Sequence, residues 1–242
     1  KRWIRPASAL AAAACLLLMT GLLHGINLPM WFADYRTAKG GQSTITLSDG
    51  STVMLNTDTG VLVDFTQHSR TLILHQGEAY FSVSPDPKRP FSVQTRQGKV
   101  TALGTVFNVR QWQDSTQVTV FEHAVKVAAE QGPVLDRLNQ GQQAEFALNR
   151  PPIAAKADLN RIGGWREHRL VFKNQPLREV VEELAHYRSG KLFVVGERLA
   201  QHRVTGIFDP RDTDAALRII ENTLPIKEYR LTGRLVILAP AG

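Results

Sequence analysis

The chain has 242 residues, of which 43% are hydrophobic and 21% are charged, a composition that excludes disorder throughout and allows one or two modest cores. Its formal charge at pH 7 is +7, but the basic residues are scattered and no arginine-rich run with interleaved aromatic residues occurs, which argues against a nucleic-acid-binding surface. The single cysteine, Cys15, excludes an intramolecular disulfide, so the fold must depend on its core.

An uncharged, mostly apolar run covers residues 7–28 and is long enough to cross a bilayer. Lys1, Arg2 and Arg5 precede this run and few basic residues follow it, so the positive-inside rule predicts a cytoplasmic N-terminus. Residues 1–32 are therefore predicted to form a basic flank and a single transmembrane helix, with the rest of the chain exported. A cleaved signal peptide and a buried core helix are the alternative interpretations.

Residues 33–150 are predicted to form an all-β domain, because apolar and polar residues alternate with a period of two in many short runs. Turn residues separate these runs, as in a sandwich or a stack of strands. Asp49-Gly50, between two such runs, predicts a hairpin with a type I′ turn, since Asp and Gly tolerate positive φ.

Residues 151–164 contain two prolines and a double glycine and lose the strand periodicity, which predicts a linker. Beyond it, residues 165–242 alternate between strand and helix patterns. One helix is predicted after Pro176, where apolar residues follow helical spacing as far as Gly190.

A β-α-β pattern occurs twice in this last region, at an offset of 36 residues, so that Phe172 matches Phe208 and Phe193 matches Tyr229. The second helix is expected to begin after Asp212 as its N-cap. The fold class expected for the whole chain is mainly β plus α+β, with a transmembrane helix, an all-β domain and a final domain of two β-α-β repeats.

Residues 164–195 and 103–110 resemble the FecR-type transmembrane sigma factor regulators of iron-siderophore signalling, and within that family most closely those of pseudobactin uptake. Residues 203–238 resemble the secretin and TonB short N-terminal (STN) domain. The resemblance implies a bacterial inner-membrane protein with a cytoplasmic N-terminus and a periplasmic C-terminal region. Because the chain begins at Lys1 without a methionine, we expect the cytoplasmic domain of such a regulator to lie upstream.

The resemblance further implies the partners. The upstream domain would hold an extracytoplasmic-function (ECF) sigma factor, the periplasmic region would bind the signalling domain of an outer-membrane TonB-dependent siderophore transporter, and periplasmic and intramembrane proteases would act on the chain. Exposed strand edges suit docking by strand addition. The predicted contact strands comprise Val204, Thr205, Gly206, Ile207, Phe208, Leu235, Val236, Ile237 and Leu238. The alternative is that these apolar residues are the core of the sheet.

Gly104-Thr105 matches a Gly-Thr pair at which members of the resembled family cleave themselves. The Thr105 hydroxyl would attack the Gly104 carbonyl and convert the amide into an ester that water hydrolyses. In the alternative interpretation, Gly104 eases a close backbone approach and Thr105 is an ordinary strand residue.

The motifs of enzymes that bind nucleotides or metals or use a serine or cysteine nucleophile are absent from the sequence, so we expect no enzymatic turnover and no cofactor. The histidines are dispersed without ligand spacing, and no metal site is expected. Two other functional classes stay open: a cell-envelope scaffold or assembly protein built from the same modules, and an envelope polysaccharide hydrolase, which would need paired carboxylates in a groove.

Overall fold

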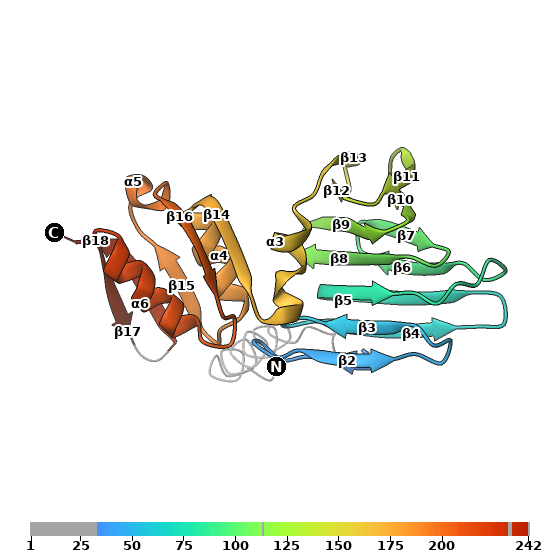
Figure 1. Cartoon of the computed structure of the whole chain (residues 1–242), viewed down its shortest axis with the longest axis horizontal. Helices are drawn as coiled ribbons and strands as arrows, with labels where there is room; N and C mark the ends of the chain where they lie inside the picture. The colour runs from blue at the N-terminus through green and yellow to red at the C-terminus, as the bar shows by residue number, and fades with distance from the viewer. Residues whose placement is uncertain (1–32, 113, 232–233, 242) are drawn as a thin grey trace, which may run out of the picture.

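The computed structural model describes residues 33–112, 114–231 and 234–241, which form two lobes placed side by side (Figure 1). The first, the β-lobe, contains the strands β1 to β13. The second, the C-terminal lobe, contains the strands β14 to β18 and three helices. The predicted transmembrane helix at 7–28 lies outside the described residues, and within them no helix is long and apolar enough to cross a membrane. The expectation of a mainly β protein with some helix is confirmed.

Two sheets make up the β-lobe, and they share the long strand β5. Sheet A has the order β1-β4-β5-β6-β7-β10-β11, and sheet B has the order β2-β3-β5-β8-β9-β12-β13. The strand bounds are β1 Tyr35–Arg36, β2 Ser43–Thr46, β3 Thr52–Leu55, β4 Gly60–Phe65, β5 Arg70–Ser82, β6 Phe91–Thr95, β7 Gly98–Ala102, β8 Val106–Trp112, β9 Ser115–Glu122, β10 Ala124–Ala129, β11 Val134–Asn139, β12 Gln142–Ala147 and β13 Arg150–Lys156.

The core of the β-lobe lies between the inner faces of the two sheets. Phe81 of sheet B stacks on Phe107 of the same sheet, with ring centroids 5.0 Å apart, and meets Phe91 of sheet A edge-on at 6.0 Å. All three rings are fully buried. The period-two pattern in the sequence therefore marks one apolar face of each sheet, as expected for a sandwich.

Strand β5 passes from sheet A to sheet B at Gly77. Its first half pairs with β4 and β6, and its second half pairs with β3 and β8. Gly77 has a φ of +92°, and a Cβ atom there would lie 2.3 Å from Thr59 Oγ1. Only glycine combines this backbone conformation with this close approach, so β5 needs a glycine at position 77 to pass from one sheet to the other.

The Asp49-Gly50 hairpin is present, but its turn differs from the predicted type. Strands β2 and β3 pair with Thr46 opposite Thr52, which leaves a five-residue connection. Gly50 has positive φ and Asp49 does not. The Asp49 carboxylate instead accepts a hydrogen bond from the Ser51 backbone N–H at 3.0 Å, an arrangement that replaces the type I′ turn.

The predicted linker at 151–164 is not an irregular connector. Residues Arg150–Lys156 form strand β13, an edge of sheet B that pairs with β12, and Leu159–Gly163 form the short helix α3. A 3₁₀ turn, η1 (Gly164–Glu167), follows directly. The two prolines are tolerated because an edge strand does not use every backbone N–H in pairing. Apart from residues 157 and 158, the segment between the lobes therefore has regular secondary structure.

Both predicted β-α-β units are present in the C-terminal lobe. The first consists of β14 (Leu170–Pro176), α4 (Leu177–His186) and β15 (Lys191–Val194), and the second of β16 (Arg203–Phe208), α6 (Thr213–Thr223) and β17 (Ile226–Leu231). Helix α5 (Glu197–Ala200) joins the units, and β18 (Leu235–Pro240) closes the lobe. Asp212 caps α6 as predicted, because its carboxylate accepts from the Ala215 N–H at 2.8 Å.

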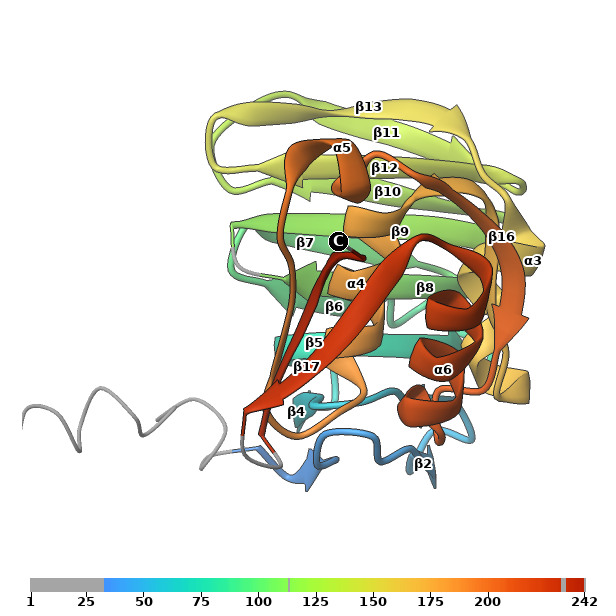
Figure 2. The ribbon, with the colours of Figure 1, turned by 90° about the vertical axis from the view of Figure 1, so that its left-hand side faces the viewer.

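The strands of the C-terminal lobe form two small sheets. Strand β14 pairs with β16, while β15, β18 and β17 form a three-stranded sheet with β18 in the middle. Helix α4 packs its buried residues Leu177, Val180, Val181 and Leu184 inside the lobe. Figure 2 shows β17 and α6 on the side that faces away from the β-lobe.

Candidate interaction and cleavage sites

The structure separates the predicted partner-binding residues into two sheets. Strand β16 carries the first group and, among the described residues, pairs only with β14, so its other edge is free. Val204 and Phe208 are buried, as the core interpretation expects, whereas Ile207 is 60% exposed. A partner strand could therefore pair with the free edge of β16, where Ile207 is the exposed apolar residue.

Strand β18, which carries the second group, cannot accept an added strand. It lies between β15 and β17, and its backbone is paired on both sides, with Ile237 opposite Phe193 and Tyr229. Val236 and Leu238 are buried in the lobe. The edge argument for residues 235–238 is therefore wrong, because the last strand inserts between two earlier ones, an order that no local pattern in the sequence indicates.

The outward face of this three-stranded sheet is apolar. Phe193, Ile237 and Tyr229 lie in one row across the strands, and Phe193 and Tyr229 are each 47% exposed. In the next row, Leu231 pairs with Leu235 and is also exposed. We call this surface, formed by Phe193, Tyr229, Leu231, Leu235 and Ile237, the open face. Phe193 and Tyr229, which occupy matching positions of the two repeats, both lie on this face, on either side of Ile237.

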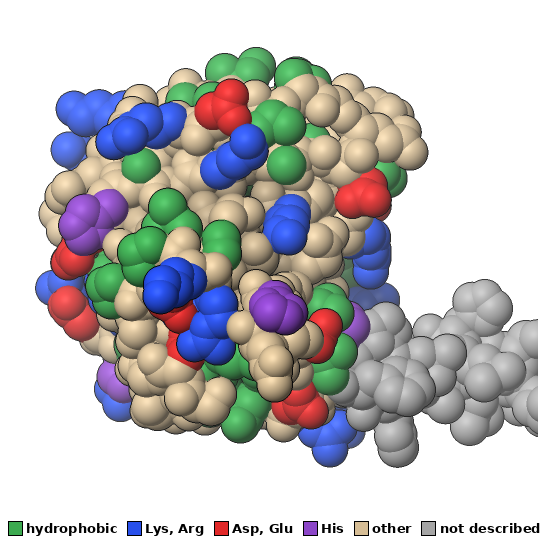
Figure 3. All heavy atoms as spheres, turned by 90° about the vertical axis from the view of Figure 1, so that its right-hand side faces the viewer, with side chains coloured by type: hydrophobic (Ala, Val, Ile, Leu, Met, Phe, Trp, Pro, Cys, Tyr) green, Lys and Arg blue, Asp and Glu red, His purple; other side chains and the backbone are tan. Residues whose placement is uncertain are grey.

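The charged residues of the open face are basic. Lys191 of β15 lies beside Leu235 of β18. Lys227 lies two residues before Tyr229 on β17, and its Nζ atom is 5.8 Å from the centroid of the Tyr229 ring. The opposite end of the molecule differs, because Lys, Arg, Asp and Glu side chains are interspersed there with scattered apolar ones (Figure 3). An apolar surface bordered by cations fits an apolar partner surface bordered by carboxylates.

Gly104 and Thr105 lie in the turn between β7 and β8. Gly104 has a φ of +139°, and a Cβ atom there would lie 3.1 Å from atoms of Pro85. The Thr105 side chain is buried, and its hydroxyl donates weakly to the Ala124 carbonyl at 3.4 Å. Thr105 lines a surface pocket together with His123, which also has positive φ. The close approach of Gly104 to Pro85 supports the structural interpretation of this glycine and leaves the reactive one untested.

A polar contact that the sequence did not indicate joins the two lobes. Arg110 of β8 and Glu183 of α4 form an ion pair at 2.6 Å. Beside them, the buried Glu78 carboxylate accepts hydrogen bonds from Asn56 Nδ2 at 2.9 Å and Asn108 Nδ2 at 2.8 Å. One guanidinium thus lies near two carboxylates, at the place where the last turn of α4 meets the outer face of sheet B.

The end of α4 adds three further contacts. The amide of Asn56 donates to the Tyr187 hydroxyl at 2.7 Å, and Thr57 Oγ1 donates to the His186 carbonyl at 2.9 Å. The His186 ring stacks on Trp112, with centroids 4.0 Å apart. Because these groups come from the β3–β4 turn and from β8, they hold α4 across several strands of the β-lobe.

The segment between the lobes is fastened to the same face. The Arg166 guanidinium of η1 lies over the Tyr80 ring at 3.9 Å and over the Phe121 ring at 5.2 Å. A cation over two aromatic faces is attracted by both rings. A cavity of about 250 Å³ remains between the lobes, lined among others by Glu78, Arg110 and Trp165.

Burial and charge act together on the ionisable groups of this contact. Burial raises the pKa of Glu78 above its ordinary value, and the Arg110 charge offsets this only in part. Burial alone would also raise the pKa of Glu183, but its ion pair with Arg110 outweighs burial and lowers it. Burial raises the pKa of the Tyr187 hydroxyl, which therefore stays protonated. Of the two carboxylates, Glu183 is the one that Arg110 holds ionised.

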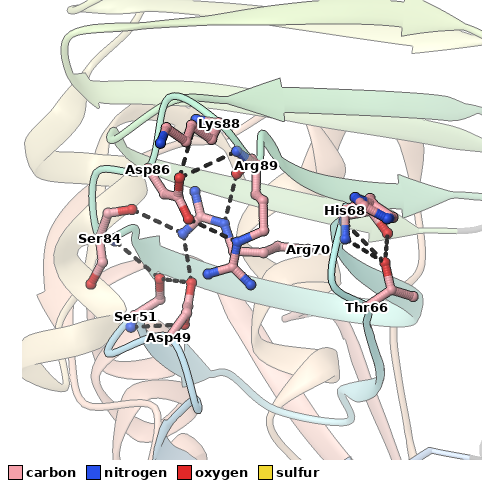
Figure 4. Close-up of polar contacts among 10 residues, drawn as sticks. Asp49, Ser51, Thr66, His68, Arg70, Ser84, Asp86, Lys88 and Arg89 are labelled. Carbon is pink, nitrogen blue, oxygen red and sulfur yellow. Dashed lines mark hydrogen bonds and ion pairs between the residues drawn. The ribbon is translucent and has the colours of Figure 1, made fainter.

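A buried ion pair, Asp49–Arg70, lies elsewhere in the β-lobe and is structural (Figure 4). The fully buried Arg70 donates to Asp49 at 2.7 Å and to the carbonyls of Ser84 and Arg89. Ser51 also donates to the Asp49 carboxylate, at 2.7 Å. The cluster ties the β2–β3 turn to the start of β5 and to the loop before β6. Within the described residues, no group of three or more His, Cys, Asp or Glu side chains could hold a metal ion.

Residues 33–126 match the family model of the FecR protein, and residues 169–238 match the model of the FecR C-terminal region. The chain belongs to the FecR family. Two crystal structures of a protein from Parabacteroides distasonis ATCC 8503, described as a "putative anti-sigma factor", superimpose on this FecR-family chain with TM-scores of 0.72 and 0.70 at 26% identity. They cover 86% of this chain and 99% and 98% of their own. No curated protein matches the chain by sequence.

The Asp49–Arg70 pair predicts an acid-dependent loss of stability. Burial alone would raise the pKa of Asp49, but the bonds from Ser51 and Arg70 lower it, so its folded pKa lies below its unfolded value. The stabilisation is therefore complete above the unfolded pKa and is lost as pH falls through the folded pKa. Asp49→Asn, which leaves Arg70 buried without an anion, should lower the free energy of unfolding by about 3 kcal/mol at pH 7.

Urea denaturation at pH 7 and at about pH 2.5 measures this difference between wild type and variant. We expect the difference to shrink at the lower pH, because this pH lies below the unfolded pKa of Asp49 and the stabilisation from its lowered folded pKa is then partly lost. Asp136→Asn is the control, because Asp136 is exposed and its pair with Lys126 should contribute less than about 1 kcal/mol. A difference that is the same at both pH values would contradict the assignment.

Proposed function

We propose that this FecR-family chain is a sigma factor regulator of the anti-sigma type. The observation that carries the proposal is the match of both lobes, over 86% of the chain, to the Parabacteroides distasonis protein described above. The family membership of the two regions, 33–126 and 169–238, supports the same function. A regulator of this class acts by binding, which agrees with a molecule whose distinctive features are surfaces and a contact between lobes.

In the finer form of the proposal, the described region lies in the periplasm and senses a partner there. The apolar run at 7–28 would anchor the chain in the inner membrane as a single pass, and a cytoplasmic domain upstream would hold an ECF sigma factor. The periplasmic partner would be the signalling domain of an outer-membrane TonB-dependent siderophore transporter, of the pseudobactin type or another. Proteases in the periplasm and the membrane would pass the signal on.

The C-terminal lobe is the best place for the partner to bind. Its open face presents Phe193, Tyr229 and Leu231 to solvent, and large aromatic residues dominate the energy of protein interfaces. The neighbouring sheet of this STN-like lobe adds the free edge of β16 with the exposed Ile207. Strand addition at this edge and packing on the open face are two ways in which one lobe can bind one partner.

The cell-envelope scaffold is the second candidate function. It would use the same lobes and the same apolar surface to assemble with envelope proteins, without a sigma factor. Binding of a transporter signalling domain, together with sigma-dependent transcription that responds to this chain, distinguishes the regulator from the scaffold.

The open face predicts a specific loss of binding. Phe193→Ser and Tyr229→Ser each remove a half-exposed ring, so the fold should persist while affinity for the signalling domain falls about 30-fold or more. Calorimetric titration with signalling domains excised from TonB-dependent transporters measures this affinity. Ile153→Ser is the matched control, because Ile153 is an exposed apolar residue on β13 of the β-lobe. Equal affinities for wild type and the two open-face variants would rule this surface out.

Self-cleavage at Gly104-Thr105 is a separate proposal for the same chain. The Thr105 hydroxyl would add to the Gly104 carbonyl, the C–N bond would break to free the Thr105 amine, and water would hydrolyse the resulting ester. A base must take the hydroxyl proton, and the exposed His123, which lines the same pocket, is available for this role. The products would stay associated, because β7 and β8 on the two sides of the break are each paired in the sheets.

Thr105→Ala should abolish this cleavage, whereas Thr105→Ser should retain it, because serine keeps the hydroxyl nucleophile. Intact mass spectrometry of chain purified under denaturing conditions reads out the two fragments. If wild type and Thr105→Ala both remain whole, Thr105 is an ordinary residue of the β7–β8 turn and Gly104 serves only its approach to Pro85.

A further inference from the structure

The face of sheet B beneath the C-terminal lobe carries a group of buried polar residues beside the aromatic residues Tyr80, Trp112 and Phe121. Asn56, Glu78, Asn108 and Thr119 point to this side, and each of these residues is at most 3% exposed. The opposite, inner face of the same strands is apolar and carries residues such as Phe81 and Phe107. If this face were always buried, apolar side chains would stabilise the protein more than these buried polar side chains do.

Several buried polar atoms of this contact have no protein partner within the described residues. They include Asn108 Oδ1 and Thr119 Oγ1 on neighbouring positions of β8 and β9, and Trp165 Nε1 of η1. Such atoms oppose tight docking and are hydrated readily when the two surfaces part. The same chemistry that weakens the docked state therefore favours a separated state in which sheet B faces water.

A small set of directional contacts opposes this separation and holds the lobes together. The Arg110–Glu183 pair, the Asn56–Tyr187 bond and the stacking of His186 on Trp112 all involve the last turn of α4. Contacts of this kind break together when the helix end moves away, unlike an interdigitated apolar core. In the described residues the chain crosses between the lobes once, through α3 and η1, so separation breaks no other covalent path.

We propose that the end of α4 is a latch, and that the C-terminal lobe separates reversibly from the outer face of sheet B while both lobes stay folded. Each lobe has its own buried cluster, which persists when the latch opens, although the partly buried Met54 and Tyr80 of the β-lobe then lose their packing against the C-terminal cluster. The polar groups of sheet B and the cavity of about 250 Å³ then become open to solvent. Under the proposed function, this separation gives partner binding on the C-terminal lobe a way to change the lobe nearer the membrane segment.

Distances between spin labels on the two lobes test the latch. The labels would be placed at Lys126→Cys in the β-lobe and Lys227→Cys in the C-terminal lobe, both at exposed positions, in the full chain with Cys15→Ser. The wild type should give one main distance. Tyr187→Phe, which removes only the hydroxyl that Asn56 binds, and Glu183→Gln should each raise a longer-distance population about tenfold.

Glu145→Gln is the control, because Glu145 lies on the same face of sheet B but pairs with the exposed Arg150 of its own lobe. It should leave the distances unchanged. Distance distributions of Tyr187→Phe and Glu183→Gln that match the wild type would overturn the latch. So would a longer distance that appears only together with lost β-lobe circular dichroism, since that is unfolding. No partner is added, so the result is independent of whether the proposed transporter domain binds.

Discussion

The contact of Arg110 with Glu183, beside the buried Glu78, is the interaction on which the arrangement of this molecule depends. It joins the middle of sheet B to the end of α4, and through α4 it sets how the whole C-terminal lobe is placed. The Arg110 and Glu183 side chains are about a quarter exposed, at 24% and 22%, so removing either one leaves its partner's charge only partly hydrated, which opposes displacement of the helix end. In the docked state the position of the second lobe thus depends on this ion pair together with the packing of Met54 and Tyr80 against the C-terminal cluster.

This placement decides which surfaces are available for binding. Helix α4 uses one side for the core of its own lobe and its last turn for sheet B. The three-stranded sheet is left with its open face exposed, with Phe193 and Tyr229 on its two outer strands and Ile237 between them. Only the other side of that sheet is needed for the core. An apolar surface and a polar contact therefore lie on opposite sides of one small lobe, which can connect binding on one side to movement on the other.

Local patterns predicted much of the fold. The alternation in strands such as β5 and β9, the helical spacing of α4 and the Asp212 cap of α6 all depend on residues close in sequence, and the structure contains these elements. Strand β13 was missed because Pro151 and Pro152 suggest a linker, and an edge strand with mostly exposed residues shows no alternation. The central place of β18 was missed because strand order depends on long-range pairing.

No pattern of residues close in sequence predicts the contact between the lobes either. Glu183 lies on the helix side that the sequence assigns to solvent, and Arg110 belongs to an ordinary strand pattern. Their pairing depends on docking across 73 positions of the chain. Tyr187 falls within the stretch that carries the family resemblance, yet its bond to Asn56 spans 131 positions and cannot be read from either residue alone.

A double-mutant cycle on Arg110→Met and Glu183→Met measures the central interaction most directly. Urea denaturation of wild type, both single variants and the double variant gives the coupling free energy between the two side chains. The account predicts a coupling of about 2 kcal/mol, with the double variant more stable than the sum of the single losses implies. A coupling near zero would contradict it and would mean that the lobes are held by other contacts.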